Sequence, residues 1–326
     1  MTVGSPIIST NEGELLRHVR PTVLDQGDVD VVVLDNASDD STADVAREFG
    51  VRCVRLEERS SFCRAMNVGV ARVAGEALLF VQPDTFLTPG FLETARARLA
   101  DPEVGSVAPK LIRTLGPDES QRLDVLDTAG MVVDRRRKNG LVGHGRPALA
   151  YDEPTDVFGP DGAVALYRRE VLEEVAVDGE VFDEDLVTWG ADADLAWRVR
   201  TLGWRCVYEP RAVAYHIRRY SPSTRSQMPE WDRMMQFRNR YLMIAKNDGW
   251  RELLRDSPRI AAYEVLALGF ALLRERHLLR GYIEAARLLP RMLRKRRILQ
   301  HRRRELAATG RALARAPLPY ALEARP

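Results

Sequence analysis

The stretch from Val181 to His216 holds the densest set of side chains that could act as acids, bases or metal ligands. It contains six carboxylates, three tryptophans and one histidine. Leu195, Val199 and Leu202 recur at helical spacing, which predicts an amphipathic helix with Asp192 near its start. A carboxylate at that place can cap the helix, or it can accept a proton from a substrate. The spacing alone leaves both interpretations open.

Three other groups of polar side chains each follow an apolar segment that is typical of a buried strand. Thr10, Asn11 and Glu12 follow the first such segment, Asp35 and Asn36 the second, and Asp84 the third. These segments alternate with helical patterns, which predicts an α/β protein whose parallel sheet binds ligands at the carboxyl ends of its strands. The glycine-rich patterns of dinucleotide and P-loop sites are missing. Carboxylates at these ends favour a nucleoside hydroxyl, a base edge or a metal ion as the ligand.

The remaining elements are less regular. We expect residues 114–156, which are polar and basic, to form a long excursion at the mouth of the site. Residues 157–167 (VFGPDGAVALY) should return as a strand, and a helix over Arg169–Val175 should follow. The three cysteines are scattered, which indicates reduced thiols. No signal-peptide pattern and no apolar run long enough to span a bilayer is present, which predicts a cytoplasmic protein.

Charge is unevenly distributed along the chain. Residues 251–326 carry 18 Lys and Arg against 7 Asp and Glu, whereas residues 1–250 carry 31 against 40. The strongest cluster of cations lies between Arg291 and Arg304, close to the apolar segment Val265–Leu273. This combination predicts contact with an anionic membrane surface. The alternatives are a helical pair that packs on the main domain and a homodimer contact. Nucleic acid is not expected, because the basic tail lacks interleaved aromatic residues.

Five segments in order resemble the family 2 glycosyltransferases, which have the GT-A fold, and especially their rhamnosyltransferase-like members. The segments are VVVLDNASDDST (31–42), RAMNVGVARVAGE (64–76), LLFVQPDTFLTPGF (78–91), VFGPDGAVALYRR (157–169) and FDEDLVTWGADADLAWRVRTLGWRCVYEPRAVAYH (182–216). Together they span most of residues 5–216, and the tail beyond residue 250 takes no part. The resemblance implies a GT-A nucleotide-binding sheet flanked by helices.

The resemblance also implies roles for individual residues. Seven positions match residues that bind the nucleotide sugar donor: Thr10, Asn11, Glu12, Asp35, Asn36, Arg64 and Asp84. Asp192 matches the catalytic base, and Asp84 with His216 matches the ligands of Mg²⁺ or Mn²⁺. At the acceptor we expect Asp161, which could instead close an Asx turn, and Trp189, which could instead be a core residue. Asp194 is expected to cap the helix or to pair with Arg198.

Two positions depart from the family pattern. Gln82 stands where relatives often have Asn or Asp, and this weakens the case for a two-carboxylate metal site. Ala191 replaces the Glu of the family's Glu-Asp pair. The loss of this neighbouring like charge should lower the pKa of Asp192.

The sequence therefore predicts a GT-A catalytic domain over residues 1–245 and a basic helical region over 246–326. The donor half of the domain should cover about 1–112 and the acceptor half about 113–245. The expected reaction is inverting transfer of rhamnose or another hexose from a UDP- or dTDP-linked donor to a glycan or lipid-linked glycan. We expect it at the inner face of the cell membrane, in bacterial surface polysaccharide synthesis. A non-catalytic nucleotide- or glycan-binding protein and a nucleotidyltransferase are the alternatives.

Overall fold

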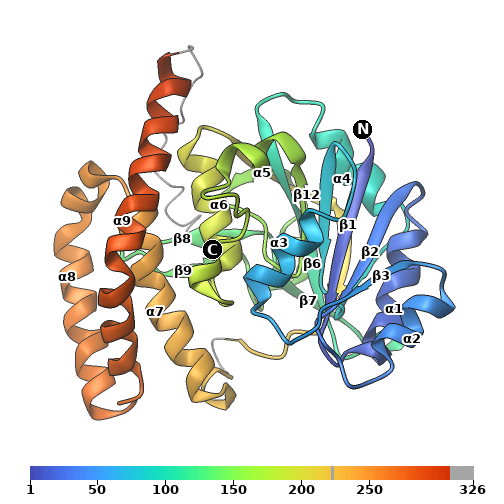
Figure 1. Ribbon diagram of the computed structural model, residues 1–326, viewed down its shortest axis with the longest axis horizontal. Helices are drawn as coiled ribbons and strands as arrows, with labels where there is room; N and C mark the ends of the chain where they lie inside the picture. The colour runs from blue at the N-terminus through green and yellow to red at the C-terminus, as the bar shows by residue number, and fades with distance from the viewer. Residues whose placement is uncertain (222–223, 309–326) are drawn as a thin grey trace.

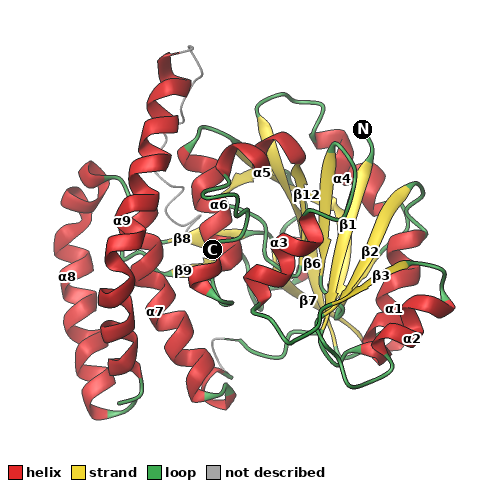
Figure 2. Ribbon diagram, in the orientation of Figure 1, coloured by secondary structure: helices red, strands yellow, loops and turns green. Residues whose placement is uncertain are grey.

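The computed structural model describes residues 1–221 and 224–308, and a ten-stranded sheet lies at the centre of this part of the chain (Figures 1 and 2). The strand order is β10-β12-β6-β11-β4-β1-β2-β3, with β5 paired to β12 and β7 paired to β6. Its strands are β1 (Val3–Ser9), β2 (Val29–Asp35), β3 (Arg52–Arg55), β4 (Ala77–Val81), β5 (Thr85–Leu87), β6 (Val104–Thr114), β7 (Arg122–Thr128), β10 (Thr155–Val157), β11 (Val164–Arg168) and β12 (Arg205–His216). A separate hairpin pairs β8 (Met131–Val133) with β9 (Asn139–Leu141).

The N-terminal half of the sheet is parallel, as predicted. β1 pairs in parallel with β2 and β4, and β2 pairs in parallel with β3. Ser9 is the register partner of Asp35, so β1 and β2 end side by side. All residues of β1 and β4 are buried, which is the pattern of strands covered by helices on both faces. The polar segments after β1, β2 and β4 consequently meet at one edge of the sheet.

The C-terminal half of the sheet departs from the expected strand over residues 157–167. This segment contains two strands: β10 ends at Val157 and pairs with β12, whereas β11 begins at Val164 and lies between β4 and β6, antiparallel to both. The residues between β10 and β11 form a loop that packs against the helix that begins after residue 190. A Cβ atom on Gly159 would lie 2.2 Å from the Cβ atom of Ala196, so this approach requires glycine.

Helices cover both faces of the sheet. They are α1 (Gly13–Leu24), α2 (Thr42–Glu48), α3 (Phe62–Val70), α4 (Phe91–Arg98), α5 (Arg169–Val175), α6 (Ala191–Thr201), α7 (Glu230–Asn247), α8 (Trp250–Leu273) and α9 (Leu278–Ala308). Alternate residues of β2 enter different cores: Val32 and Leu34 pack with α3 and α6, whereas Val31 and Val33 pack with α1, α2 and α4. The predicted helix over Arg169–Val175 is confirmed.

The basic helix α9 packs on the body of the protein. Met292 and Ala285 of α9 join the core that contains α3 and α6, and α9 lies against α7 (Figure 1). Its cations bind carboxylates of the segment before α6: Arg291 pairs with Asp185 at 3.0 Å, and the buried Lys295 pairs with Asp183 at 2.5 Å. Part of the positive charge of the tail is therefore neutralised by carboxylates of the body. No described helix is both long and apolar enough to cross a bilayer.

Candidate active site

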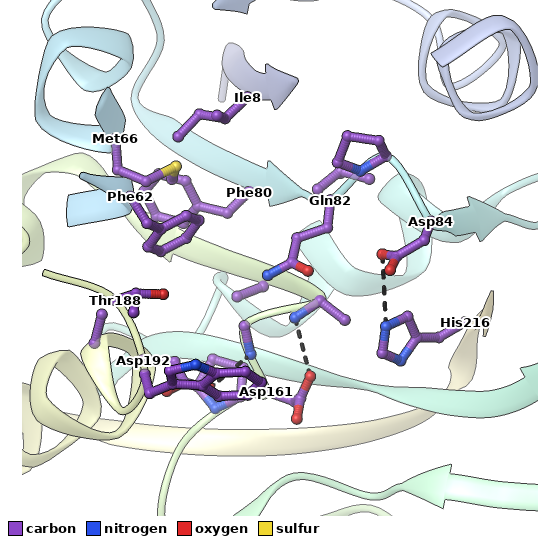
Figure 3. Close-up of a pocket in the computed structure, with 18 of the residues that line it drawn as sticks. Ile8, Phe62, Met66, Phe80, Gln82, Asp84, Asp161, Thr188, Asp192 and His216 are labelled. Atoms are coloured by element: carbon purple, nitrogen blue, oxygen red, sulfur yellow. Dashed lines mark hydrogen bonds and ion pairs between the residues drawn. The ribbon is translucent and has the colours of Figure 1, made fainter. Parts of the chain in front are cut away.

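A cavity of about 400 Å³ opens at the carboxyl ends of the strands and collects residues from distant parts of the chain (Figure 3). Seven of the predicted site residues line it: Thr10, Glu12, Asp84, Asp161, Trp189, Asp192 and His216. Gln82 lines it as well and contributes an amide where relatives often have an acidic residue. The predicted base Asp192 and the predicted metal ligands thus share one cavity, whose volume suits a small-molecule ligand.

Asp192 is held at the start of α6 by two backbone N–H groups. Its Oδ1 atom accepts a hydrogen bond from the N–H of Ala193 at 2.8 Å, and its Oδ2 atom accepts one from the N–H of Gly162 at 3.0 Å. A Cβ atom on Gly162 would lie 3.2 Å from that Oδ2 atom. The glycine loop therefore lets the backbone approach the carboxylate and fix its position. The helix begins after Gly190, which is in the left-handed region and has no side chain to cap it, so Asp192 satisfies one free N–H group of the first turn.

Burial and a neighbouring like charge keep Asp192 basic. Desolvation is the larger cause and the charge of Asp161 the second, and together they raise the pKa of Asp192 to about 6. The lower pKa that Ala191 suggested is therefore wrong, because Asp161 supplies the like charge from another segment. Asp194 has a different role: it is fully buried and pairs with Arg198 at 2.9 Å. This ion pair matches the second of the two interpretations offered for Asp194.

Asp84, His216 and Asp127 form a chain of contacts at the other side of the cavity. The Nε2 atom of His216 lies 3.6 Å from Oδ1 of Asp84, and its Nδ1 atom lies 2.8 Å from Oδ2 of Asp127 (Figure 3 shows the first contact). Burial alone would lower the pKa of His216, but the hydrogen bond to Asp127 and the nearby Asp84 raise it to about 9. Burial alone would raise the pKa of Asp127, but the hydrogen bonds and charges of His216 and Arg218 hold it well below its usual range.

This arrangement fits a divalent cation, which would bind His216 in place of the Nε2 proton that the two carboxylates otherwise stabilise. The Oδ1 atom of Asp84 is buried and has no hydrogen-bond partner among the described residues. An imidazole whose second nitrogen is held by a carboxylate is a common metal ligand, because the carboxylate fixes the orientation of the ring. Within residues 1–221 and 224–308 no cluster of three or more His, Cys, Asp or Glu residues could hold a metal. Asp84 and His216 would therefore provide only part of a coordination shell, and substrate oxygens would complete it.

Two residues of this region had no role in the sequence analysis. Arg218 lines the cavity and pairs with Asp127 at 2.7 Å and with Asp161 at 3.1 Å, which links the two sides of the site. Asp127 lies on β7, within the segment that was expected to be a long excursion at the mouth of the site, and it is fully buried. The position of Arg218 two residues after His216 could have indicated its role. No pattern around Asp127 distinguishes it from the other acids of that segment.

Four predicted donor-binding residues do not line the cavity: Asn11, Asp35, Asn36 and Arg64. Asp35 is buried and accepts hydrogen bonds from Ser38 at 2.8 Å and from Arg55 at 2.7 Å. The Nδ2 atom of Asn36 donates to the hydroxyl of Thr10 at 3.1 Å, so Asn36 supports a residue that does line the cavity. Asn11 and Arg64 are exposed to solvent.

Trp189 presents an aromatic surface to the cavity. Its indole Nε1 atom donates a hydrogen bond to Asp232 of α7 at 2.8 Å, and its ring centroid lies 6.4 Å from that of Tyr220, which also lines the cavity. The hydrogen bond fixes the tilt of the indole. An aromatic face held in this way can pack against the apolar face of a sugar ring.

Comparisons with solved structures show the fold. The chain superimposes on a structure of GalNAc-T7 with UDP, GalNAc and Mn²⁺ with a TM-score of 0.59 and 15% identity, over 76% of this chain and 48% of that one. It superimposes on a mannosyltransferase of Pyrobaculum calidifontis in complex with GDP-Man and Mn²⁺ with a TM-score of 0.52 and 20% identity, over 88% of this chain and 86% of that one. The predicted GT-A fold is confirmed.

Sequence comparisons show the family. The chain is 27% identical over 168 residues to the pre-mycofactocin glycosyltransferase of Mycobacterium tuberculosis, a match that covers 51% of this chain and only 31% of that relative. The model of the family described as glycosyl transferase family 2 matches residues 7–176, which is more than half of the chain. This chain therefore belongs to glycosyl transferase family 2.

Proposed function

We propose that this protein is an inverting glycosyltransferase that moves a sugar from a nucleotide diphosphate sugar to the hydroxyl group of a glycan. The observation that carries this proposal is the presence of Asp192, a buried carboxylate with a raised pKa, in the same cavity as Asp84 and His216. A sugar hydroxyl is a poor nucleophile until a base accepts its proton during attack. A carboxylate with a pKa of about 6 is mostly ionised at neutral pH and remains a stronger base than a solvated aspartate.

In this mechanism the chain binds the donor and the acceptor on opposite sides of the anomeric carbon. Asp192 accepts the proton of the acceptor hydroxyl as its oxygen attacks, and the bond to the diphosphate breaks on the other side, so that the configuration inverts. Trp189 packs against the acceptor sugar, and Asp161 and Arg218 orient its hydroxyl groups. Asp84 and His216 would hold Mg²⁺ or Mn²⁺. The cation would supply positive charge where the leaving diphosphate gathers negative charge.

The resemblance and the charge of the chain support a proposal for the donor and the acceptor. We propose a UDP- or dTDP-linked donor, with Thr10, Asn11, Glu12, Asp35, Asn36 and Arg64 as donor-binding residues. Asn36 would act through its hydrogen bond to Thr10. The transferred sugar is rhamnose or another hexose, and the acceptor is a glycan or a lipid-linked glycan of a bacterial surface polysaccharide. For such an acceptor the protein works in the cytoplasm at the inner face of the membrane.

Replacing Asp192 with Asn tests this proposal. The D192N variant should lose transfer while its affinity for the nucleotide sugar, measured by calorimetry, stays within a few fold of the original, because the base contacts the acceptor side. Loss of donor binding would instead give Asp192 a structural role. Release of pyrophosphate would indicate a nucleotidyltransferase, and donor binding without any sugar release would indicate a non-catalytic binding protein. Full transfer in excess chelator would remove Asp84 and His216 from the metal-binding role.

A further inference from the structure

The outer side of α8 exposes a continuous apolar surface. Six large apolar side chains are exposed there, and we call them the α8 apolar face: Val265, Leu266, Leu268, Phe270, Leu272 and Leu273. Val265 and Leu266 are each 72% exposed and Leu273 is 83% exposed, whereas Ala271 on the opposite side of the helix is buried. Figure 1 shows α8 at the left edge of the molecule, and the exposure of these side chains shows that the described residues leave this face uncovered. Isolated exposed leucines are ordinary, but a face of this extent indicates an interaction surface.

Polar contacts attach the inner side of α8 to the body. Glu264 binds Arg240 at 2.6 Å and also accepts a hydrogen bond from the hydroxyl of Tyr241. Asp256, near the start of the helix, is fully buried and pairs with Arg137 at 2.9 Å. The carboxylates of Asp256 and Glu264 thus both point inward. Their contacts fix which side of the helix faces solvent, so the exposure of the apolar face is built into the fold.

The exposed charges at both ends of the α8 apolar face are positive. Residues 261–273 contain no charged residue other than Glu264, which is held inward, and they extend for about 20 Å as a helix. Arg259 precedes this segment, and Arg274 and Arg276 follow it, all exposed. The outward surface is therefore an apolar strip with arginine at both ends. Such a helix lies in the plane of a membrane interface, with its apolar side chains among the acyl chains and its arginines at anionic head groups.

The cations of α9 are less available for this purpose. Arg291, Arg294 and Lys295 pair with carboxylates of the segment from Asp178 to Asp185. Three of the eight cations between Arg291 and Arg304, which first indicated a membrane contact, therefore fasten α9 to the body. The surface suited to a membrane belongs to the neighbouring helix.

We propose that the α8 apolar face binds the surface of an anionic lipid membrane. The proposal rests on the membrane location that we propose for this protein, and it does not require the transfer reaction. A second copy of the chain is a poorer partner for the same face. If two α8 helices paired antiparallel, Arg259 of one would approach Arg274 of the other, and a parallel pair would bring Arg259 against Arg259. The described outer side of α8 has no carboxylate between residues 257 and 274 to offset this repulsion.

Sedimentation with lipid vesicles tests the proposal on the full chain. The protein should bind vesicles of phosphatidylcholine mixed with phosphatidylglycerol, bind pure phosphatidylcholine more weakly, and lose affinity as salt rises. The double variant L266E/L273E should bind the mixed vesicles at least about tenfold more weakly, because two leucines no longer enter the lipid and two negative charges face it. The matched control is L115E/L149E, which makes the same change at leucines of 70% and 73% exposure in the catalytic part and should leave binding unchanged.

The outcomes separate this proposal from its rivals. Equal vesicle binding by L266E/L273E and the original protein would overturn it, as would the absence of any binding to anionic vesicles. Light scattering on the same samples provides a second readout: a dimer that L266E/L273E converts to a monomer, without vesicle binding, would assign the face to a second copy. D192N should bind vesicles like the original protein. If the protein binds vesicles but shows no transfer, the membrane surface stands and the proposed reaction fails.

Discussion

The carboxylate of Asp161 raises the pKa of Asp192, although the family pattern that the chain resembles places the acidic residue immediately before this aspartate. In this chain that neighbour is Ala191, and the loop through Gly162 brings Asp161 to the site from a different segment. Asp161 thus supplies a like charge near Asp192. Because desolvation also raises the pKa of Asp192, the raised pKa does not depend on one neighbour alone.

This arrangement predicts the pH dependence of transfer. Asp192 must be ionised to accept a proton, so kcat/KM should fall about tenfold per pH unit below pH 6, where the carboxyl is protonated. In D161N the like charge is gone and the pKa of Asp192 should decrease, which moves the acidic limb of the profile to lower pH. Rates measured across the acidic range check this. An acidic limb that stays in place or moves upward in D161N would mean that Asp161 does not act on the base.

The residues of the site were predictable to different degrees. Thr10, Asp84 and Asp192 follow from the ends of strands and the start of a helix, where sequence pattern and topology agree. Asp127 was not predictable, because its burial depends on the pairing of β7 with β6 and on contacts with His216 and Arg218. Such contacts join residues that are far apart in the chain and leave no local pattern.

At the scale of elements, the attachment of α9 depends on a buried network of ions. Asp183 accepts hydrogen bonds from Lys295 of α9 and from Lys246 of α7, and both lysines are almost fully buried. Burial alone would raise the pKa of Asp183, but the two lysines hold it well below its usual range. This contribution to stability is present above the ordinary pKa of an aspartate and is lost as the pH falls below it. The network also links both helices to the segment that leads into α6.

Substitution of Lys295 tests the importance of this network. K295M should lower the free energy of unfolding by about 3 kcal/mol, because it removes one partner of a buried charge while Lys246 remains. R297A is the matched control, since Arg297 is an exposed cation on the same helix, and it should change the free energy by no more than about 0.5 kcal/mol. Urea titration measures both. Similar effects of the two substitutions would show that α9 is not held by Lys295.

Element prediction succeeded where local pattern and tertiary context agree. The helix over Arg169–Val175 lies where it was predicted, and β2 and β4 are the apolar strands that were expected before Asn36 and Asp84. The segment from 157 to 167 failed, because its apolar residues resemble one strand while Gly159 and Gly162 allow a close approach to α6. That approach separates β10 from β11. Its cause lies in another element, which no local window contains.

At the scale of the whole molecule, the opposite charges of the two parts of the chain explain how they fit together. The acidic body and the basic tail predict an external anionic partner for the tail. In the structure, carboxylates of the segment from Asp178 to Asp185 bind cations of the tail instead. The division at residue 245 remains a prediction. Even so, Met292 and Ala285 of α9 belong to the main core, so the two regions share one hydrophobic interior.

A chain that ends after Asn247 should therefore fail to fold cooperatively. Its main core would lose the side chains of α9, and Asp183 would keep only one of its two lysines. Calorimetry of the shortened chain should show no sharp unfolding transition. A transition near that of the full chain would mean instead that residues 1–247 are an independent domain.

The pairing of Asp183 with Lys295 has a consequence for the synthesis of the protein on the ribosome. The lysine is synthesised 112 residues after the aspartate, which at about 5–20 residues per second corresponds to a delay of roughly 6 to 20 s on the ribosome. Until Lys246 emerges, 63 residues after Asp183, the nascent polypeptide has neither lysine partner for this carboxylate, and for the rest of the interval it has only one. The buried ion network around Asp183 is therefore completed only when translation has passed Lys295 of α9.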